Sequence, residues 1–163
     1  TFTVSGRIDL TMGGPGVQHF SQSKGPQITP ALDYATYDWG AENAPRRSIY
    51  RYVWRGIADP FMEALDFPDL GLLSPNRAFS ASSLQSLALY NNDFVLYHSQ
   101  ALASRVSEER SETADQIARA VELCWQRKPS ASEASAFAAH VESYGLAALC
   151  RVLLNSNEYL FVD

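Results

Sequence analysis

In the carboxy-terminal half of the chain, apolar residues recur at three- and four-residue steps, a spacing that predicts amphipathic helices. One helix is expected to begin at Ser82 or Ser83, and Asn92 or Asp93 can cap the next one. The inward stripe of this second helix consists of Phe94, Val95, His98, Leu102 and Val106. These two helices are expected to open an antiparallel bundle with short links.

Two further helices are predicted from capping boxes, in which a Ser or Thr precedes a Glu or Gln by three residues. The box at 113–116 precedes an apolar face formed by Ile117, Val121 and Cys124. The box at 130–133 opens a helix that ends near Ser143, because Gly145 breaks the pattern. A last helix ends near Leu154, and its inward residues are Leu146, Leu149, Cys150, Leu153 and Leu154.

The first 45 residues are punctuated by Gly and Pro, so we expect an irregular arm with short extended pieces. Alternating apolar positions within residues 1–10 favour a strand there. Residues 48–55 also alternate, and their β-branched and aromatic side chains predict a strand. Pro60 suits the first turn of a short helix that ends near Leu65, before Pro68.

These elements together predict an α+β fold that is predominantly α, with a carboxy-terminal helical bundle, a small β element and a long irregular amino-terminal segment. We expect a single-domain fragment over residues 1–163. Its parts are an arm (1–45), a strand, short helix and loop (46–81), the bundle (82–156) and a closing extended segment (157–163). The closing segment is predicted to pair as a strand with 48–55 or with the arm.

Composition narrows the choice of partners. The net charge of −5 argues against nucleic acid, because binding to phosphates needs a basic face. No run of 18 apolar residues could form a transmembrane segment. The chain begins at Thr1 with no signal-peptide pattern, so we interpret it as a piece of a longer protein. Cys124 and Cys150 lie among apolar residues and are expected to be buried thiols.

A cluster of four arginines, Arg46, Arg47, Arg51 and Arg55, is the first candidate site. If residues 48–55 form a strand, Arg47, Arg51 and Arg55 share one face and could bind an anion. The alternative is that these arginines form structural ion pairs with the acidic residues downstream, which are Glu63, Asp66 and Asp69. We favour the ion pairs, because structural pairs outnumber anion sites.

The other candidates are oxygen- and amide-rich. Glu63, Asp66 and Asp69 could bind calcium or act as an acid and a base, but the glycine and donor pattern of a calcium loop is missing, so capping is favoured. The Asn-rich helix ends at 91–93 and 155–158 also suit capping. The same amides could bind sugar hydroxyls, with Tyr50, Trp54, Tyr90 or Tyr159 as stacking platforms.

No pattern of a metal site, a phosphate loop or a serine nucleophile is present in the sequence. The histidines, His19, His98 and His140, are far apart and lack metal-ligand spacing. The glycine-rich segment 13–16 is predicted to be a turn, or a place where the backbone approaches another chain closely. We therefore expect no cofactor or metal within these residues.

Several stretches together resemble the carboxy-terminal module of planctomycete-type proteins known as the domain of unknown function 1553. They are, in order, Met12–Pro15, Arg47–Tyr50, Phe67–Asp69, Arg77, Leu84–Asn92 and Leu153–Tyr159. Residues 126–133 are similar to the family's GRxPTxxE connection, although Gln126 replaces its usual glycine and Lys128-Pro129 its usual proline pair. Tyr90–Asp93 also departs from the family's more usual LNDP or LNGE form.

The resemblance implies a cellular location and neighbouring domains, but it implies no particular reaction. Family members are typically large exported proteins, so a periplasmic or cell-surface location is implied. A neighbouring cytochrome c domain is implied in some members, which would place a haem c on an upstream domain of the parent protein. Genomic association implies a link with polysaccharide utilisation.

Two functions fit these observations. The first is an accessory, scaffold or interaction module that packs against upstream domains or partner chains; we favour it because no catalytic motif is recognisable. The second is a glycan- or anion-binding or polysaccharide-processing domain. Its site would gather Arg47, Arg51, Asp66, Asp69, Arg77, Gln85, Asn91, Asn155 and Glu158. A ligand site should expose aromatic faces beside this cluster, whereas a scaffold should bury the cluster in ion pairs.

Overall fold

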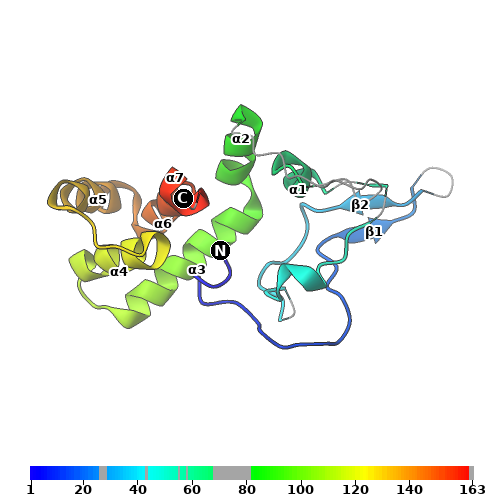
Figure 1. Ribbon diagram of the computed structural model, residues 1–163, viewed down its shortest axis with the longest axis horizontal. Coiled ribbons are helices and arrows are strands. Elements are labelled where there is room, and N and C mark those ends of the chain that lie inside the picture. Colours follow the sequence, from blue (N-terminus) through cyan, green and yellow to red (C-terminus); the bar gives the residue numbers. More distant parts are fainter. Residues whose placement is uncertain (26–28, 43, 55, 58, 68–81, 162–163) are drawn as a thin grey trace. The chain divides into compact units, whose positions relative to one another are not determined.

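A computed structural model describes residues 1–25, 29–42, 44–54, 56–57, 59–67 and 82–161. It has the predicted fold class, predominantly α with a small antiparallel sheet (Figure 1). The chain divides into two compact units. We call residues 1–8 and 89–163 the bundle unit and residues 9–88 the sheet unit, and we describe each by itself.

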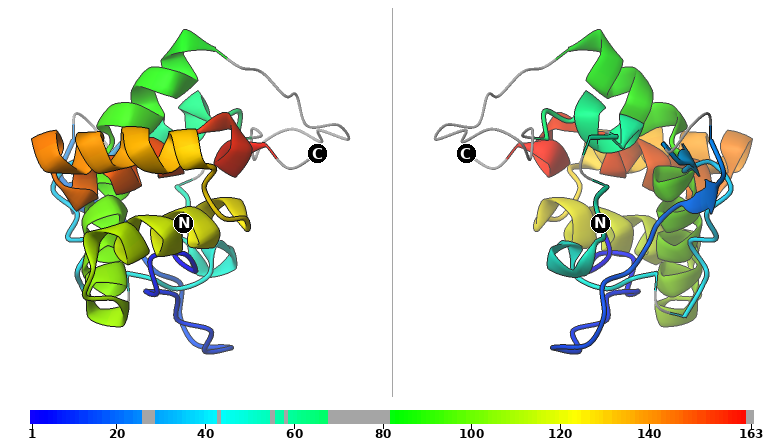
Figure 2. Two further views of the ribbon diagram at one scale, coloured as in Figure 1. Left: turned by 90° about the vertical axis from the view of Figure 1, so that its left-hand side faces the viewer. Right: turned by 90° about the vertical axis from the view of Figure 1, so that its right-hand side faces the viewer.

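The bundle unit is built from helices that follow one another with short links. They are α3 (Asp93–Glu109), α4 (Thr113–Trp125), α5 (Ala131–Tyr144), α6 (Leu146–Leu154) and α7 (Asn157–Leu160), and α2 (Ser83–Asn91) spans the boundary between the units. Helices α5 and α6 lie side by side, and α3 packs against α4 and α6 (Figure 2). Of the helices in the described residues, none has the length and apolar character needed to cross a bilayer.

The core of the bundle unit consists of the predicted apolar stripes. Buried side chains come from α3, α4 and α6, and they include Leu102, Val106, Ile117, Val121, Cys124, Leu149, Cys150, Leu153 and Leu154. Both cysteines are free and buried, as expected. Burial raises the pKa of each thiol to about 12, so neither is a thiolate at neutral pH.

Most helix boundaries agree with the capping signals in the sequence. The Asn92 side chain accepts a hydrogen bond from Phe94 N at 2.9 Å, and the predicted capping box at Ser130 and Glu133 is confirmed. Gly145, with a φ of 87°, separates α5 from α6. The predicted box at 113–116 is wrong, because Thr113 is already helical and α4 begins without a side-chain cap.

The two ends of the bundle unit differ from their predictions. The predicted strand in residues 1–10 is wrong, because residues 2–6 form turns in which Ser5 N donates to Thr1 O at 3.0 Å. The α3 residue Arg105 holds this segment by donating to Val4 O at 2.8 Å. The predicted closing strand is also wrong, because Asn157–Leu160 forms helix α7. Four helical residues therefore stand where the alternating apolar pattern predicted extended backbone.

The described residues of the sheet unit form a hairpin, a short 3-10 helix, a short α-helix and most of α2. Strands β1 (Ser21–Ser23) and β2 (Ala31–Asp33) are antiparallel, with Ser21 opposite Asp33. The 3-10 helix is η1 (Ser48–Tyr50), and the α-helix is α1 (Pro60–Ala64). The small β element was therefore predicted correctly as a class but lies in the arm rather than at 48–55.

The strand predicted at 48–55 is wrong. Residues 48–50 are η1, and the segment after them makes a single bridge with Val17, whose N donates to Tyr50 O and whose O accepts from Tyr52 N, both at 2.7 Å. A longer ladder is prevented on this side because Pro15 has no N–H and the glycines before it turn the chain. Arg55 lies outside the described residues.

Candidate functional site

The loop 11–16 of the sheet unit is held by one arginine. Arg46 donates to the carbonyl oxygen of Pro15 at 2.6 Å, to that of Thr11 at 3.3 Å, and to that of Gly13. Its guanidinium carbon lies 3.8 Å from the centre of the Tyr50 ring, and only 10% of its side chain is exposed. A buried cation that donates to successive carbonyls fixes the path of the loop.

The glycines make this path possible. Gly13 and Gly14 have φ values of 81° and 82°, a conformation that L side chains rarely adopt. Gly13 N donates to the Tyr50 hydroxyl at 2.6 Å, so the same tyrosine that stacks on Arg46 also anchors the loop backbone. The predicted turn at 13–16 is thus a rigid loop rather than a loose connection.

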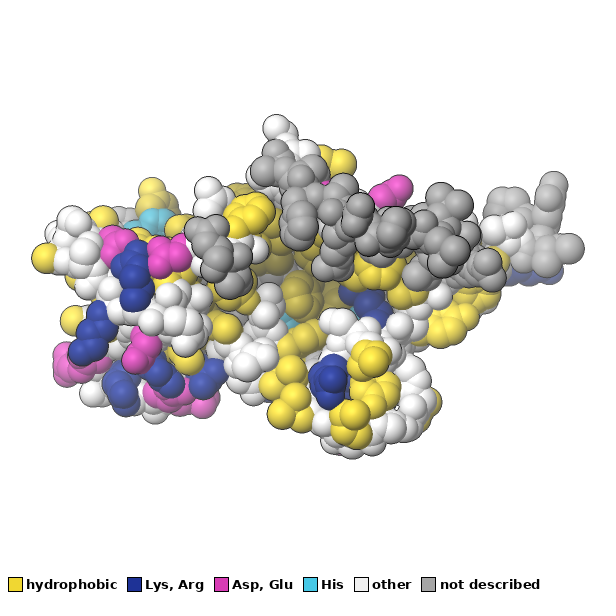
Figure 3. Space-filling model, in the orientation of Figure 1, with side chains coloured by type: hydrophobic (Ala, Val, Ile, Leu, Met, Phe, Trp, Pro, Cys, Tyr) yellow, Lys and Arg dark blue, Asp and Glu magenta, His cyan; other side chains and the backbone are white. Residues whose placement is uncertain are grey.

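The rigid loop and η1 expose apolar side chains. Leu10 is 64% exposed, Met12 is 69% exposed and Ile49 is 78% exposed. Arg47 is exposed as well, and its Nη1 lies 3.0 Å from the Met12 sulfur. We call Leu10, Met12, Arg47 and Ile49 the clamped surface. Figure 3 shows apolar side chains bordering basic ones on this unit.

Arg51, four residues after Arg47, is largely buried rather than exposed. It forms an ion pair with Asp59, and only 13% of the Arg51 side chain and 4% of the Asp59 side chain are exposed. Asp59 also caps α1, because its Oδ1 accepts from Phe61 N at 2.9 Å and from Met62 N at 3.3 Å. Burial lowers the pKa of Arg51 from its usual value. The pair therefore joins the η1 segment to α1.

A buried histidine and two tyrosines surround this pair. His19 is 4% exposed, and its ring contacts Tyr37 and Trp39 with centroids 4.8 and 5.0 Å apart. Its Nε2 lies 3.2 Å from Ala44 O, which favours the tautomer with the proton on Nε2. Burial, reinforced by the charge of Arg51, lowers the pKa of His19 to about 4. The imidazole is therefore neutral at pH 7.

Three buried polar atoms of this region have no hydrogen-bond partner within the described part of the chain. They are His19 Nδ1, the Tyr34 hydroxyl and the Tyr37 hydroxyl. Burial raises the pKa of both tyrosines, so both hydroxyls stay protonated. Apart from the paired Arg51 and Asp59, the buried polar groups of this region are neutral. Such an interior is consistent with a structural role, in which these groups hold the surrounding segments in place.

Other predicted site residues also serve the fold. Gln85 Nε2 donates to Asp66 Oδ2 at 2.7 Å, and Gln85 and Ser82 bond each other's backbone N at 3.2 Å as a capping box for α2. Asn91 is the last residue of α2. The structure thus brings Asp66 and Gln85 together, while Asp69 and Arg77 lie outside the described residues.

The remaining predicted residues, Asn155 and Glu158, lie in the bundle unit. Asn155 Nδ2 donates to Arg151 O at 2.8 Å and so caps the end of α6. Glu158 pairs with Arg127 at 2.6 Å, and Arg127 also pairs with Glu133 at 2.8 Å. Hydrogen bonds from Arg127 lower the pKa of Glu133 to about 2 and hold that of Glu158 below its usual value. Acidic and basic side chains are interleaved over this unit (Figure 3).

Sequence reasoning missed several residues on which these arrangements depend. Asp59 directly precedes Pro60, and this Asp-Pro pair is a helix-start signal that could have identified it. Arg46 belongs to the predicted arginine cluster, but it binds backbone carbonyls, so no partner residue could reveal its role. His19 carries no spacing signal, and its burial follows only from the folded arm.

The described residues offer no arrangement typical of a metal centre. No three His, Cys, Asp or Glu side chains gather closely enough there to hold an ion. Two acidic residues of the sheet unit, Asp59 and Asp66, already accept hydrogen bonds from the protein itself. The arrangement of loop 11–16 and η1 can present a fixed apolar surface, the clamped surface, together with the exposed cation of Arg47.

The comparison with known protein families gives one result. A family model described as "Protein of unknown function (DUF1553)" matches residues 1–141 of the chain. No curated protein and no solved structure shows significant similarity to this chain.

Proposed function

The chain belongs to the family described as "Protein of unknown function (DUF1553)", and from this membership and the geometry of the sheet unit we propose that it is a non-catalytic interaction module of a larger protein. The clamped surface is its binding surface. The partner is a protein segment that carries apolar side chains and at least one carboxylate, from an upstream domain of the same protein or from a partner chain.

One observation carries this proposal: Arg46 holds an exposed apolar loop rigid. A loop that is fixed before binding loses little conformational entropy when a partner docks, so its apolar contacts contribute more fully to affinity. Met12 is an adaptable apolar contact of the kind enriched at protein interfaces. The exposure of Met12 and Ile49, at 69% and 78%, leaves this surface open to a partner.

Charge supports the choice of partner. Arg47 is exposed beside Met12, so a partner carboxylate can pair with it at the edge of the apolar contact. The chain as a whole has a net charge of −5, which repels an acidic partner. The exposed Arg47 attracts the partner's carboxylate locally and so sets the orientation of the partner.

A glycan- or anion-binding or polysaccharide-processing role at the predicted Arg/Asp/Asn cluster has less support. Arg51 is paired with Asp59 and buried, and Gln85 bonds Asp66. Asn155 caps a helix of the bundle unit. A binding site for a charged ligand needs charged groups that are free to meet it, and these groups already have partners.

The setting we propose is an exported one, periplasmic or at the cell surface, within a multidomain protein that in some cases carries haem c on another domain. The support is the family resemblance of the motifs alone. Fractionation of cells that express the parent protein, followed by detection with an antibody to this chain, tests it. Recovery in the cytoplasm would contradict the exported setting.

The interaction itself is tested by selecting peptides from a phage-displayed library against this chain. Selected peptides should combine apolar residues with Asp or Glu. Their affinity should fall at least about tenfold for Met12→Asp and for Ile49→Asp, as for central interface positions. Val152→Asp, at an exposed apolar position of the bundle unit, is the matched control and should leave affinity unchanged. Failure to select peptides, or equal binding to Met12→Asp, would contradict the proposal.

A further inference from the structure

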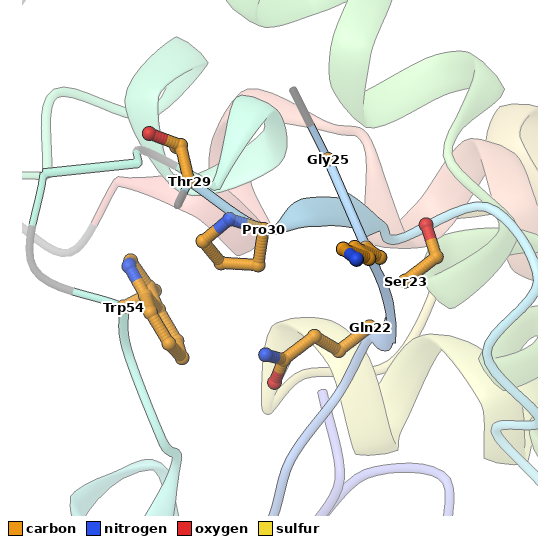
Figure 4. A pocket seen from close by; sticks show the side chains of 7 residues that line it. Gln22, Ser23, Gly25, Thr29, Pro30 and Trp54 are labelled. Carbon is orange, nitrogen blue, oxygen red and sulfur yellow. The ribbon is translucent and has the colours of Figure 1, made fainter. Parts of the chain in front are cut away.

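The hairpin of the sheet unit borders a hollow of about 550 Å³. It is lined by Gln22, Ser23, Lys24, Gly25, Thr29, Pro30 and Trp54. In Figure 4, the Gln22 side chain extends toward Trp54 and Pro30, whereas the Ser23 side chain points the other way, as successive residues of a strand do. The volume falls within the range of ordinary small-molecule sites.

Trp54 belongs to a row of aromatic rings. Its ring meets Tyr52 at 6.2 Å with a 66° angle between planes, and Tyr52 in turn meets Phe20 at 6.0 Å. Phe20 is buried, so this row of rings anchors the indole to the core of the sheet unit. The tryptophan is therefore a fixed platform rather than a freely turning surface side chain.

Gly25 keeps the end of the hairpin closed. A Cβ atom at this position would lie 2.2 Å from Thr29 O and 2.9 Å from Ala31 N, both backbone atoms that cannot move aside. The two sides of the hairpin thus approach as closely as a glycine permits. Ser23 lies opposite Ala31 in the strand register, and beyond this pair Lys24, Thr29 and Pro30 border the hollow.

The lining has a specific chemical character. It offers the amide of Gln22, the hydroxyl of Thr29 and the ammonium of Lys24, next to the flat indole of Trp54. No carboxylate is among the described lining residues. Saccharides have apolar C–H faces that pack on aromatic rings and hydroxyls that bond amides and hydroxyls, and an ammonium group adds a preference for an anionic substituent.

We propose that this hollow binds an acidic saccharide. The sugar ring packs on the Trp54 indole, its hydroxyls bond the Gln22 amide and the Thr29 hydroxyl, and its anionic group pairs with Lys24. The site shares no residue with the clamped surface. It also differs from the Arg/Asp/Asn cluster, with which it shares no residue.

The test is isothermal titration calorimetry of the whole chain with trigalacturonate, maltotriose and sodium acetate as three separate titrants. Saturable binding of trigalacturonate is expected, with maltotriose at least about tenfold weaker, because the charge-assisted bond to Lys24 is lost. Trp54→Ala should weaken trigalacturonate binding by about tenfold or more. Lys24→Gln, an exposed substitution that should not disturb folding, should abolish the preference for trigalacturonate over maltotriose.

Two controls make the outcome decisive. Lys128→Gln removes the other lysine, which is exposed in the bundle unit, and should change nothing; Met12→Asp alters the clamped surface and should bind trigalacturonate normally. Absence of binding by the wild-type chain would overturn the proposal. So would acetate binding as tightly as trigalacturonate, or equal binding by Lys24→Gln. Equal affinity for maltotriose would overturn the preference for an acidic sugar.

Discussion

Arg51 and Asp59 form an ion pair from which solvent is almost excluded, with 13% and 4% of their side chains exposed. Removing either partner leaves an uncompensated buried charge, which is far more costly than losing a surface pair. Arg47, on the other side of η1, is exposed and belongs to the clamped surface. Arg51 therefore holds the sheet unit together, while Arg47 is exposed at the surface proposed to bind a partner.

The buried histidines make stability depend on pH. Burial lowers the pKa of His19 and of His98 from 6.5 to about 4. A folded pKa below the unfolded one means that the stabilisation is present above pH 6.5 and is lost as the pH falls toward 4. Between pH 7 and pH 5 we expect a loss of about 2 kcal/mol per histidine. Urea unfolding at these two pH values measures it.

His98→Asn provides the matching control. His98 lies in the bundle unit, where its Nδ1 lies 2.8 Å from Ser5 Oγ, and His19 lies in the sheet unit. In the variant, the pH-dependent loss should shrink to the part that belongs to His19. A wild-type chain as stable at pH 5 as at pH 7 would show that neither imidazole is held neutral.

Gln126 should be replaceable by glycine with a gain in stability. It ends α4 in the left-handed conformation, with a φ of 58°, which is strained for a residue with a Cβ. We expect Gln126→Gly to raise the free energy of unfolding by roughly 0.5–1 kcal/mol, the strain relief being partly offset by the entropy of glycine. Gln126→Ala loses the same side-chain bond to Leu123 O but keeps the strain, so any gain in that variant would contradict the explanation.

The carboxy-terminal helix α7 should stabilise the bundle unit. Tyr159 packs against the core, and its hydroxyl lies 3.1 Å from Thr1 Oγ1. Truncation after Ser156 should lower the free energy of unfolding by about 2 kcal/mol, the scale of burying one large side chain. Truncation after Leu160 is the control and should have little effect, because Phe161 is 48% exposed. Equal melting temperatures for both truncations would rule out this role of α7.

Arg46 should control the rigidity of loop 11–16. Lysine keeps the charge but lacks the planar fork that reaches the carbonyls of Thr11, Gly13 and Pro15. We expect Arg46→Lys to speed amide hydrogen exchange at Gly13 and Gly14 by about tenfold, which is about 1.4 kcal/mol of local opening free energy. Unchanged exchange at both glycines would mean that the loop is held by other contacts.

The helices of the bundle unit could be predicted from the sequence because their signals are local. The apolar stripe of α3 and the capping box of α5 each lie within a few turns of one helix, where spacing translates directly into facing direction. The buried set Leu149, Cys150, Leu153 and Leu154 followed from the same rule.

The parts that could not be predicted depend on distant partners. The alternation in residues 48–55 is real, but a strand needs a neighbour with free N–H and C=O groups, and among the described residues only Val17 supplies them. The seven-residue closing segment is too short for alternation to distinguish a strand from the single turn of α7. The partner of Arg51 was expected among Glu63, Asp66 and Asp69, whereas it is Asp59, which the fold of α1 places there.

The most direct test compares Arg51→Ala with Arg47→Ala by urea unfolding at pH 7. We expect Arg51→Ala to lose about 3–5 kcal/mol, as when one partner of a buried ion pair is removed. Arg47→Ala should stay within about 0.5 kcal/mol of the wild-type chain, because its side chain is exposed. An Arg51→Ala chain as stable as the Arg47→Ala chain would contradict the claim that Arg51 holds the sheet unit together.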